Sequence, residues 1–138
     1  MSVQSHVQDL FANTAAIAAI VGSGANAKIF HGEAPQGTGM PYIILTKVSA
    51  PRGHHLRGPD GHAQVRLQID YYATTATVLN DETTGLCPAG RRALDGYKGN
   101  RKGTPIRSSI MFNERDFPTP DLKGFRVMQE FSIWVKET

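Results

Sequence analysis

The sequence contains a single cysteine, Cys87, among its 138 residues. An internal disulfide is therefore impossible, and the cysteine content gives no indication of an oxidising compartment. The longest uninterrupted apolar run, Ala15–Val21, is far too short to cross a bilayer, and the N-terminus lacks the basic segment and apolar core of a secretion signal. We therefore expect a protein that is made and folded in a cytoplasm and has no membrane partner.

Catalytic and nucleotide-binding motifs are missing as well. The sequence has no nucleophile elbow, no P-loop and no Gly-x-Gly-x-x-Gly fingerprint. Cys87 has no local signature of a neighbouring base, so we expect a buried or half-buried helix cysteine, and Asp116 and Asp121 stand beside prolines, as turn residues do. No set of residues supplies a nucleophile, a base and a stabilising group together. We predict that the protein is not an enzyme and binds no cofactor.

Histidines are the one candidate for a metal site. His54, His55 and His62 share a glycine-rich segment, and His31 lies further off. They lack the i, i+4 spacing of helical ligands, and no cysteine or carboxylate pair completes a ligand set. The sequence therefore favours solvent-exposed loop histidines and no metal.

The composition is that of a soluble globular protein, with 40% apolar and 20% charged residues. The length suits one domain, residues 1–138, and the 14 glycines and 8 prolines indicate many turns. A net charge of +3 and a pI of about 9.2 are mildly basic, whereas a dedicated nucleic-acid binder usually has a denser stripe of lysine and arginine.

The segment Gln64–Tyr72 carries the strongest structural signal in the sequence. Apolar and polar residues alternate along it with a period of two, which specifies a strand with one buried and one polar face. The apolar side consists of Val65, Leu67, Ile69 and Tyr71, and the polar side of Gln64, Arg66, Gln68, Asp70 and Tyr72. The polar face is free to be solvated or to meet another subunit.

Helical patterns occupy two regions. Apolar residues recur at helical spacing from Val3 to Val21, where Thr14 could restart a second short helix. The stretch Thr74–Tyr97 is weakly helical, with a break expected near Thr84–Pro88 because it contains Gly85, Pro88 and Gly90.

Strands and loops fill the rest. Besides Gln64–Tyr72, we expect strands at Lys28–His31, Pro41–Val48, Pro105–Arg115 and Gly124–Lys136, the last with Phe125, Val127, Phe131, Ile133 and Val135 on one face. The expected loops are Ala50–Gly61 with an Asp60-Gly61 turn, the basic segment Gly96–Gly103, and the turn Asp116–Lys123. The predicted fold is α+β, a single domain with a mainly antiparallel sheet and two helical segments packed on one face.

Two clusters of basic residues need an explanation. They are Arg52, Arg57 and Arg66, and then Arg91, Arg92, Lys98, Arg101, Lys102 and Arg107. They could contact phosphates, or they could be solvated loops and a helix C-terminus that favours positive charge. Aromatic residues are not interleaved with them as a base-stacking platform requires.

Several short segments, in this order and spacing, resemble the tail-completion proteins of long-tailed bacteriophages, also called tail terminators or head–tail joining proteins. The segments are Ala16–Gly22, Ile29–Gly32 running into Ala34–Gly37, Pro41–Leu45, Val65–Ala73 and Phe131–Trp134. The resemblance covers nearly the whole chain. The sequence departs from the family at Gly85, Pro88 and Gly90, because the middle helix of the family is usually uninterrupted.

The resemblance implies a virion protein with an antiparallel sheet flanked by helices, assembled as a six-membered ring. Such a ring caps the finished tail tube, stops its polymerisation and offers its other face to the head connector or stopper protein. DNA passes through the central hole without sequence-specific binding. The implied partners are further copies of the same chain in a hexamer, the tail tube protein and the connector.

A ring built from one chain needs a heterologous contact that closes on itself. The polar side of Gln64–Tyr72 and exposed strand edges are reasonable places for it, and we hypothesise that the loop Ala50–Gly61 grips an adjacent ring of tube or connector protein. Because DNA must slide through the hole, Arg101 and Lys102 are predicted to face partner proteins or solvent. The candidate partner-binding residues are Arg52, His54, His55, Arg57, Arg66, Gln68, Asp70, Arg101 and Lys102.

The competing function is a monomeric nucleic-acid-binding α+β module. A native mass measurement separates the two functions, since the ring requires a hexamer and the competitor is a monomer with salt-sensitive affinity for oligonucleotides.

Overall fold

The computed structural model describes residues 3–24, 27–49, 52–55, 58–119 and 124–136, and only the backbone of residues 49, 52–55, 58–62, 118–119 and 136. Its helices are α1 (Val3–Ala12), α2 (Ala15–Val21), α3 (Ala76–Asn80) and α4 (Leu86–Leu94). Its strands are β1 (Ile29–His31), β2 (Tyr42–Ser49), β3 (Arg52–His55), β4 (Gly58–Ala73), β5 (Gly99–Arg101), β6 (Thr104–Thr119) and β7 (Gly124–Lys136).

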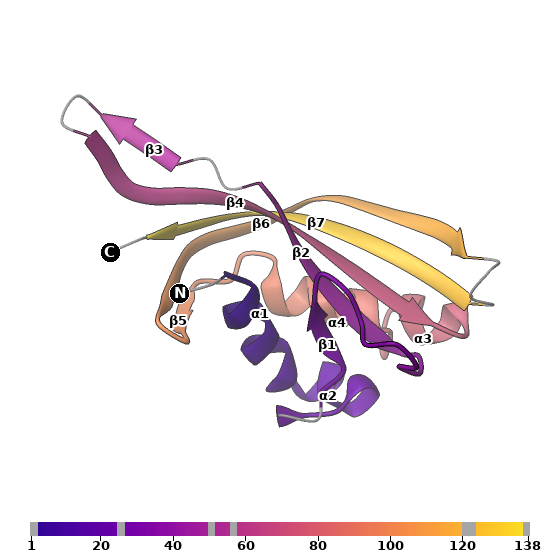
Figure 1. Ribbon diagram of the computed structural model, residues 1–138. Coiled ribbons are helices and arrows are strands. Elements are labelled where there is room, and N and C mark those ends of the chain that lie inside the picture. The colour runs from indigo at the N-terminus through magenta and orange to yellow at the C-terminus, as the bar shows by residue number, and fades with distance from the viewer. Residues whose placement is uncertain (1–2, 25–26, 50–51, 56–57, 120–123, 137–138) are drawn as a thin grey trace.

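The strands form one curved sheet in the order β1-β2-β4-β7-β6-β5, and β3 pairs with the first part of β4 (Figure 1). All pairs are antiparallel except β1 with β2, which are parallel. The α+β class with a mainly antiparallel sheet is therefore confirmed. β1 and β2 can run parallel because the segment Gly32–Pro41 is long enough to carry the chain back to the start of β2.

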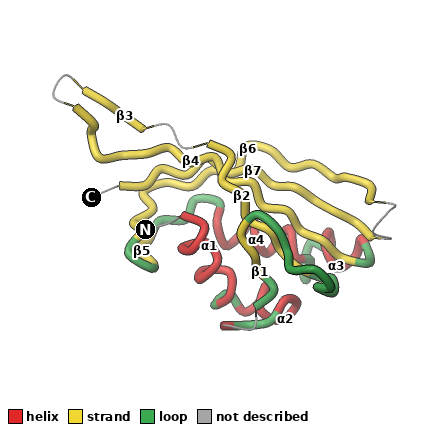
Figure 2. Tube along the Cα trace, in the orientation of Figure 1, coloured by secondary structure: helices red, strands yellow, loops and turns green. Residues whose placement is uncertain are grey.

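The central strand β4 buries its apolar residues as predicted. Val65, Leu67, Ile69 and Tyr71 are all buried, and Arg66, between two of them, is exposed. In Figure 2 the helices lie below the sheet as drawn, and their buried residues form one core with those of the strands. We call the sheet face toward the helices the inner face and the opposite one the outer face.

The helical part consists of four helices where the sequence predicted two segments. Thr14 restarts the chain as α2, as expected, and the break in the middle region falls at residues 81–85. The Asp81 carboxylate accepts hydrogen bonds from the N–H groups of Thr84 and Thr83 (3.0 and 2.9 Å), and these bonds lower its pKa. Pro88 then falls in the first turn of α4, where its missing N–H costs no helical bond.

A buried polar network fastens α4 to the sheet. The Tyr71 hydroxyl donates to Gln129 Oε1 (2.7 Å), and Gln129 Nε2 lies 2.9 Å from the Cys87 carbonyl oxygen and 2.7 Å from Glu114 Oε2. Gln129 is thus a polar residue in an otherwise apolar row of β7. Gly90 of α4 packs directly against the Tyr71 ring, because a Cβ there would come within 3.0 Å of Tyr71 Cζ and closer still to its hydroxyl.

Two predicted loops contain strands instead. The predicted loop Ala50–Gly61 contains β3 and the start of β4, so the predicted Asp60-Gly61 turn is part of a strand. In the predicted loop Gly96–Gly103, residues of β5 pair with β6. These segments lack apolar periodicity, and the sheet neighbours β4 and β6 supply the backbone hydrogen bonds that hold them extended.

The last predicted turn is also shorter than expected. Asp116 pairs with Val127 inside the β6–β7 ladder, whereas Asp121 lies outside the described residues. Pro118 is tolerated near the end of β6 because only one side of the strand is paired there. Phe125, predicted to share one face of β7 with Val127, is 46% exposed because it is the second residue of that strand, at the end of the sheet. None of the helices in the described part of the chain is long and apolar enough to span a membrane.

Candidate functional site

The outer face of the sheet carries a row of ion pairs and a group of exposed apolar side chains. The strand register places side by side the outward residues of four strands, β2, β4, β7 and β6. One row runs Ile44, Asp70, Met128 and Arg115, and the next runs Thr46, Gln68, Glu130 and Asn113. Because no helix covers this side in Figure 2, it is the broad face available to a partner.

Three of the predicted partner-binding residues, Arg66, Gln68 and Asp70, lie together on this face. Arg66 pairs with Glu130 on β7 (3.0 Å), and Gln68 Nε2 donates to Asp70 Oδ2 (2.9 Å). Asp70 was predicted on a polar face that is free to be solvated or to meet another subunit, and it is only 4% exposed because the Arg126 guanidinium lies on it at 2.8 Å. The charges of this part of the face therefore satisfy one another within the sheet.

Large apolar side chains stand exposed beside these ion pairs. Ile110, Phe112 and Trp134 are 56%, 47% and 40% exposed, and we call these three residues the apolar patch. The Arg66 guanidinium lies 5.1 Å from the centre of the Phe112 ring, so the patch continues into the paired charges. Exposed aromatic residues beside arginine are typical of protein–protein contacts.

Sequence reasoning missed the apolar patch. The alternation of Ile110 and Phe112 within the predicted strand Pro105–Arg115 was a usable signal. The irregularity between Met111 and Asn113, however, changes which residues face outward, and nothing in the sequence marks it.

A second group of predicted residues belongs to the β3–β4 hairpin. Arg52, His54 and His55 are in β3, where the backbone is described, and Arg57 lies outside the described residues. Along β4, pairing with β7 begins at His62, which lies opposite Lys136, so residues 58–61 have no partner on β7. The hairpin therefore projects past the end of β7 (Figure 1), and we call β3 together with residues 58–61 the arm.

The third group, Arg101 and Lys102, lies at the corner between β5 and α1. Arg101 Nη1 donates to Asp9 Oδ2 (2.8 Å), which raises the pKa of the arginine, and Lys102 Nζ is 4.0 Å from Asp9 Oδ1. Lys102 has a positive φ of 53°, and Gly103 follows with 74°, as a two-residue hairpin turn requires. The two cations are thus drawn toward α1. The structure does not bring the three groups of predicted residues together.

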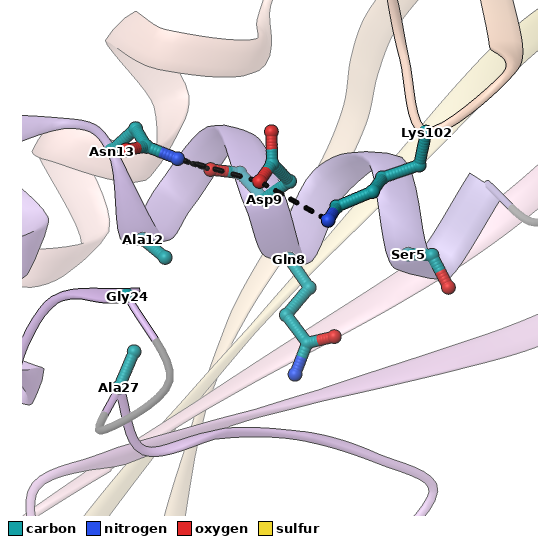
Figure 3. Close-up of a pocket in the computed structure, with 8 residues that line it drawn as sticks. All are labelled: Ser5, Gln8, Asp9, Ala12, Asn13, Gly24, Ala27 and Lys102. Carbon is teal, nitrogen blue, oxygen red and sulfur yellow. Dashed lines mark hydrogen bonds and ion pairs between the residues drawn. The ribbon is translucent and has the colours of Figure 1, made fainter.

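Beside this corner lies an open groove of about 540 Å³ (Figure 3). It is lined by Ser5, Gln8, Asp9, Ala12, Asn13, Gly24, Ala27 and Lys102. Its polar groups already have partners, since Gln8 Nε2 donates to the Ile29 carbonyl oxygen (2.7 Å) and Asn13 Nδ2 to that of Asp9 (2.8 Å). The groove offers no arrangement of nucleophile and base.

His6, in α1, is a fully buried histidine that the sequence did not single out. Its Nδ1 lies 2.7 Å from the Thr104 carbonyl oxygen and 3.2 Å from the Arg101 backbone nitrogen, and its Nε2 lies 3.0 Å from the Tyr97 hydroxyl oxygen. Burial lowers the pKa of His6, and the Thr104 carbonyl opposes this change. His6 joins α1 to the β5–β6 turn.

Two residues of the second basic cluster, Arg91 and Arg92, lie on α4. Arg91 and Arg92, in the last turn of α4, contact the carboxylate and the carbonyl oxygen of Glu82 (3.4 and 3.1 Å). This placement agrees with cations near a helix C-terminus and does not build a continuous phosphate-binding stripe with Arg101.

The possible metal ligands and the single thiol, that of Cys87, bear on whether the chain could carry metal or thiol chemistry. In the described part of the chain, no three histidine, cysteine, aspartate or glutamate side chains gather as metal ligands would. Cys87 is buried in α4, as predicted for a helix cysteine, and burial raises the pKa of its thiol, with Glu114 and Asp116 adding to the effect. A buried thiol with a raised pKa is a poor nucleophile.

Comparison with known proteins gives two findings. The family model described as Tail completion protein gp17 matches residues 5–136. Among solved structures, a chain in the "Virion of native gene transfer agent (GTA) particle" has a similar fold, with a TM-score of 0.76 and 15% identity over 98% of this chain and 95% of that chain. No curated protein sequence matches the chain.

Proposed function

Because the chain belongs to the Tail completion protein gp17 family and is therefore a structural protein of a phage-type virion, we propose that six copies form a ring at the end of the tail tube. The ring ends polymerisation of the tube and joins it to the head connector or stopper protein, and DNA passes through its central hole. The whole chain, residues 1–138, acts as one tail-terminator-like domain in this role. The observation that carries the proposal is the family match over residues 5–136.

The outer face supports a role in protein assembly. Two ion pairs lie within this face, Arg66 with Glu130 and Arg126 with Asp70, so a partner can cover these four side chains without leaving any of them unpaired. The apolar patch beside them supplies the surface whose burial drives association. We assign the outer face to contacts between protein subunits.

The placement of the cations supports passage of DNA without tight binding. Every lysine or arginine that faces the hole of a hexamer is repeated six times, and strong phosphate contacts would hold the DNA in place. Arg101 and Lys102 are turned toward Asp9, which reduces their attraction for phosphate. We therefore place them toward solvent or partner proteins, away from the channel.

Electron microscopy of purified particles tests the position of the protein. With a label at the C-terminus, we expect density at one end of the tail, at the junction with the head, and a native mass of six chains for the ring. A monomer that binds oligonucleotides with strong salt dependence, and is missing from particles, would refute the proposal.

A matched pair of substitutions tests the outer face. Phe112 and Phe125 are 47% and 46% exposed but lie on opposite faces of the sheet. Phe112→Ser is expected to lower the fraction of hexamer measured by native mass spectrometry, whereas Phe125→Ser serves as the control and leaves it unchanged. Equal effects of the two substitutions on assembly would remove the outer face from the interface.

A further inference from the structure

One edge of β6 is open over half of the strand. β7 pairs along one side of β6, and β5 covers the other side only from Thr104 to Ile106. Beyond β5, the Gly96 N–H donates to the Ser109 carbonyl (2.6 Å) and the Met111 N–H to Asp95 (3.0 Å). From residue 112 to residue 119 no strand in the described chain pairs with this edge. The open edge is roughly 26 Å long and is a template for another strand.

The open edge carries acidic side chains on its inner side. Glu114 Oε2 accepts a hydrogen bond from Gln129 (2.7 Å), which places Glu114 on the inner face, and Asp116 follows on the same side. Both residues are exposed. On the outer side, the Arg115 guanidinium lies over the Phe117 ring, 5.1 Å from its centre. Two carboxylates two residues apart disfavour an acidic strand at this edge and favour a basic one.

The arm offers a strand edge of the opposite charge. β3 pairs only with β4 in the described chain, so its second edge is open too. Over residues 50–62 the sequence holds two arginines, three histidines and a single carboxylate, Asp60. A two-stranded ribbon without a third layer is marginally stable in water, which favours an arm that is held by a partner.

We infer that β3 of one copy adds to the open edge of β6 in the next copy, which joins neighbours around the ring. This inference rests on the proposed function. The arm continues from the end of the sheet where His62 pairs with Lys136, and the open edge ends where Thr119 pairs with Gly124. The two surfaces lie at opposite ends of the sheet (Figure 1), so one copy cannot satisfy both by itself.

The contact has the symmetry that a ring needs. Each copy gives its arm to one neighbour and its β6 edge to the other, which is a heterologous contact that closes when the rotation per copy divides a full turn. Backbone hydrogen bonds hold the added strand, and the charges of the two edges select it. The partner of the arm is therefore a second copy, in place of the adjacent tube or connector ring that the sequence led us to expect.

Cross-linking of two variants, each with one introduced cysteine, tests the contact. His54→Cys marks the arm and Arg115→Cys marks the open edge, while Cys87 is buried with a raised pKa and stays unreactive. Both variants are co-expressed in the producing host, and purified particles are treated with a short bis-maleimide. We expect a covalent dimer of one H54C and one R115C chain. The matched control replaces R115C by Ala19→Cys, an exposed position on α2, and gives no dimer.

Each outcome decides one of the two proposals. Dimers between H54C and R115C, with none in particles that contain either variant alone, support the inference. Six-membered rings without such dimers, or dimers of H54C with itself, overturn the arm-to-edge contact and leave the proposed function standing. Absence of the natural chain from purified particles, although it folds in solution, refutes the proposed function.

A charge reversal gives an independent measurement. Arg52→Glu is expected to lower the hexamer fraction in native mass spectrometry, and Asp116→Arg in the same chain to restore it. A loss that the second substitution deepens would contradict the pairing of the two edges.

Discussion

Gly90→Ala is expected to destabilise the protein, although alanine is the better helix former. In an exposed helix the exchange would stabilise by about 1 kcal/mol. At position 90, however, the new methyl group would come within 3.0 Å of Tyr71 Cζ and 3.3 Å of Cε1, with the hydroxyl nearer still. Tyr71 is fully buried and its hydroxyl donates to Gln129, so the ring cannot move away freely.

The size of the effect follows from these contacts. Overpacking a well-filled core costs about 1–3 kcal/mol. If the Tyr71 hydroxyl leaves Gln129, a buried amide oxygen loses its donor, at a cost of about 1–3 kcal/mol more. After subtraction of the gain in helix propensity, the free energy of unfolding should fall by roughly 1–5 kcal/mol. Urea denaturation followed by far-UV circular dichroism measures this difference.

Tyr71→Phe supplies the control. It removes the atom nearest to the new methyl group, so Gly90→Ala should cost less in the Tyr71→Phe background than in the natural chain. We expect a coupling energy of at least about 1 kcal/mol from the double-mutant cycle. If Gly90→Ala stabilises the natural chain, or costs the same in both backgrounds, the close packing of α4 on Tyr71 is not what requires glycine there.

Three further changes can be checked by the same unfolding measurements. Burial lowers the pKa of His6, so on acidification the unfolded chain takes up a proton, below about pH 6.5, before the folded chain does. The free energy of unfolding should therefore be highest above that pH and fall as the pH is lowered. His6→Gln should weaken this dependence of stability on pH. Lys102→Asn should raise the free energy of unfolding by about 0.5–1 kcal/mol, since asparagine tolerates the positive φ better; a lower melting temperature would argue against this. Arg126→Ala should lower the free energy of unfolding by roughly 2–3 kcal/mol, because it leaves the buried Asp70 without its cation. The same substitution should lower it by less in an Asp70→Asn background. No loss in either background would show that the pair does not stabilise the fold.

The sequence predicted the centre of the fold better than its margins. The alternation from Val65 to Tyr71 identified the buried face of β4 because every second residue is apolar over a length that only a strand explains. The break before α4 was predictable because glycine and proline act locally, at Gly85 and Pro88. These signals lie within a few neighbouring residues, so no knowledge of the tertiary structure was needed.

The margins depend on partners that are distant in sequence. The arm has no apolar periodicity, and its strands exist because β3 finds β4 across the hairpin. Gln129 interrupts an apolar row because the Cys87 carbonyl, 42 residues away in the chain, lies within its reach. The apolar patch depends on the bulge in β6 and on which face the helices leave open. Such features follow from the assembled sheet, and the local pattern of the sequence does not contain them.

The length of β4 has a mechanical consequence. One unbroken strand, Gly58–Ala73, carries both the arm and the middle of the sheet, where β2 and β7 hold it on either side. The base of the arm is therefore fixed by the sheet, while the arm itself gains a further strand only when a partner binds. A fixed base leaves the arm less orientational freedom to lose on docking, which lowers the entropic penalty of association. A pull on the tip of the arm would in turn be transmitted along β4 into the core of the same subunit.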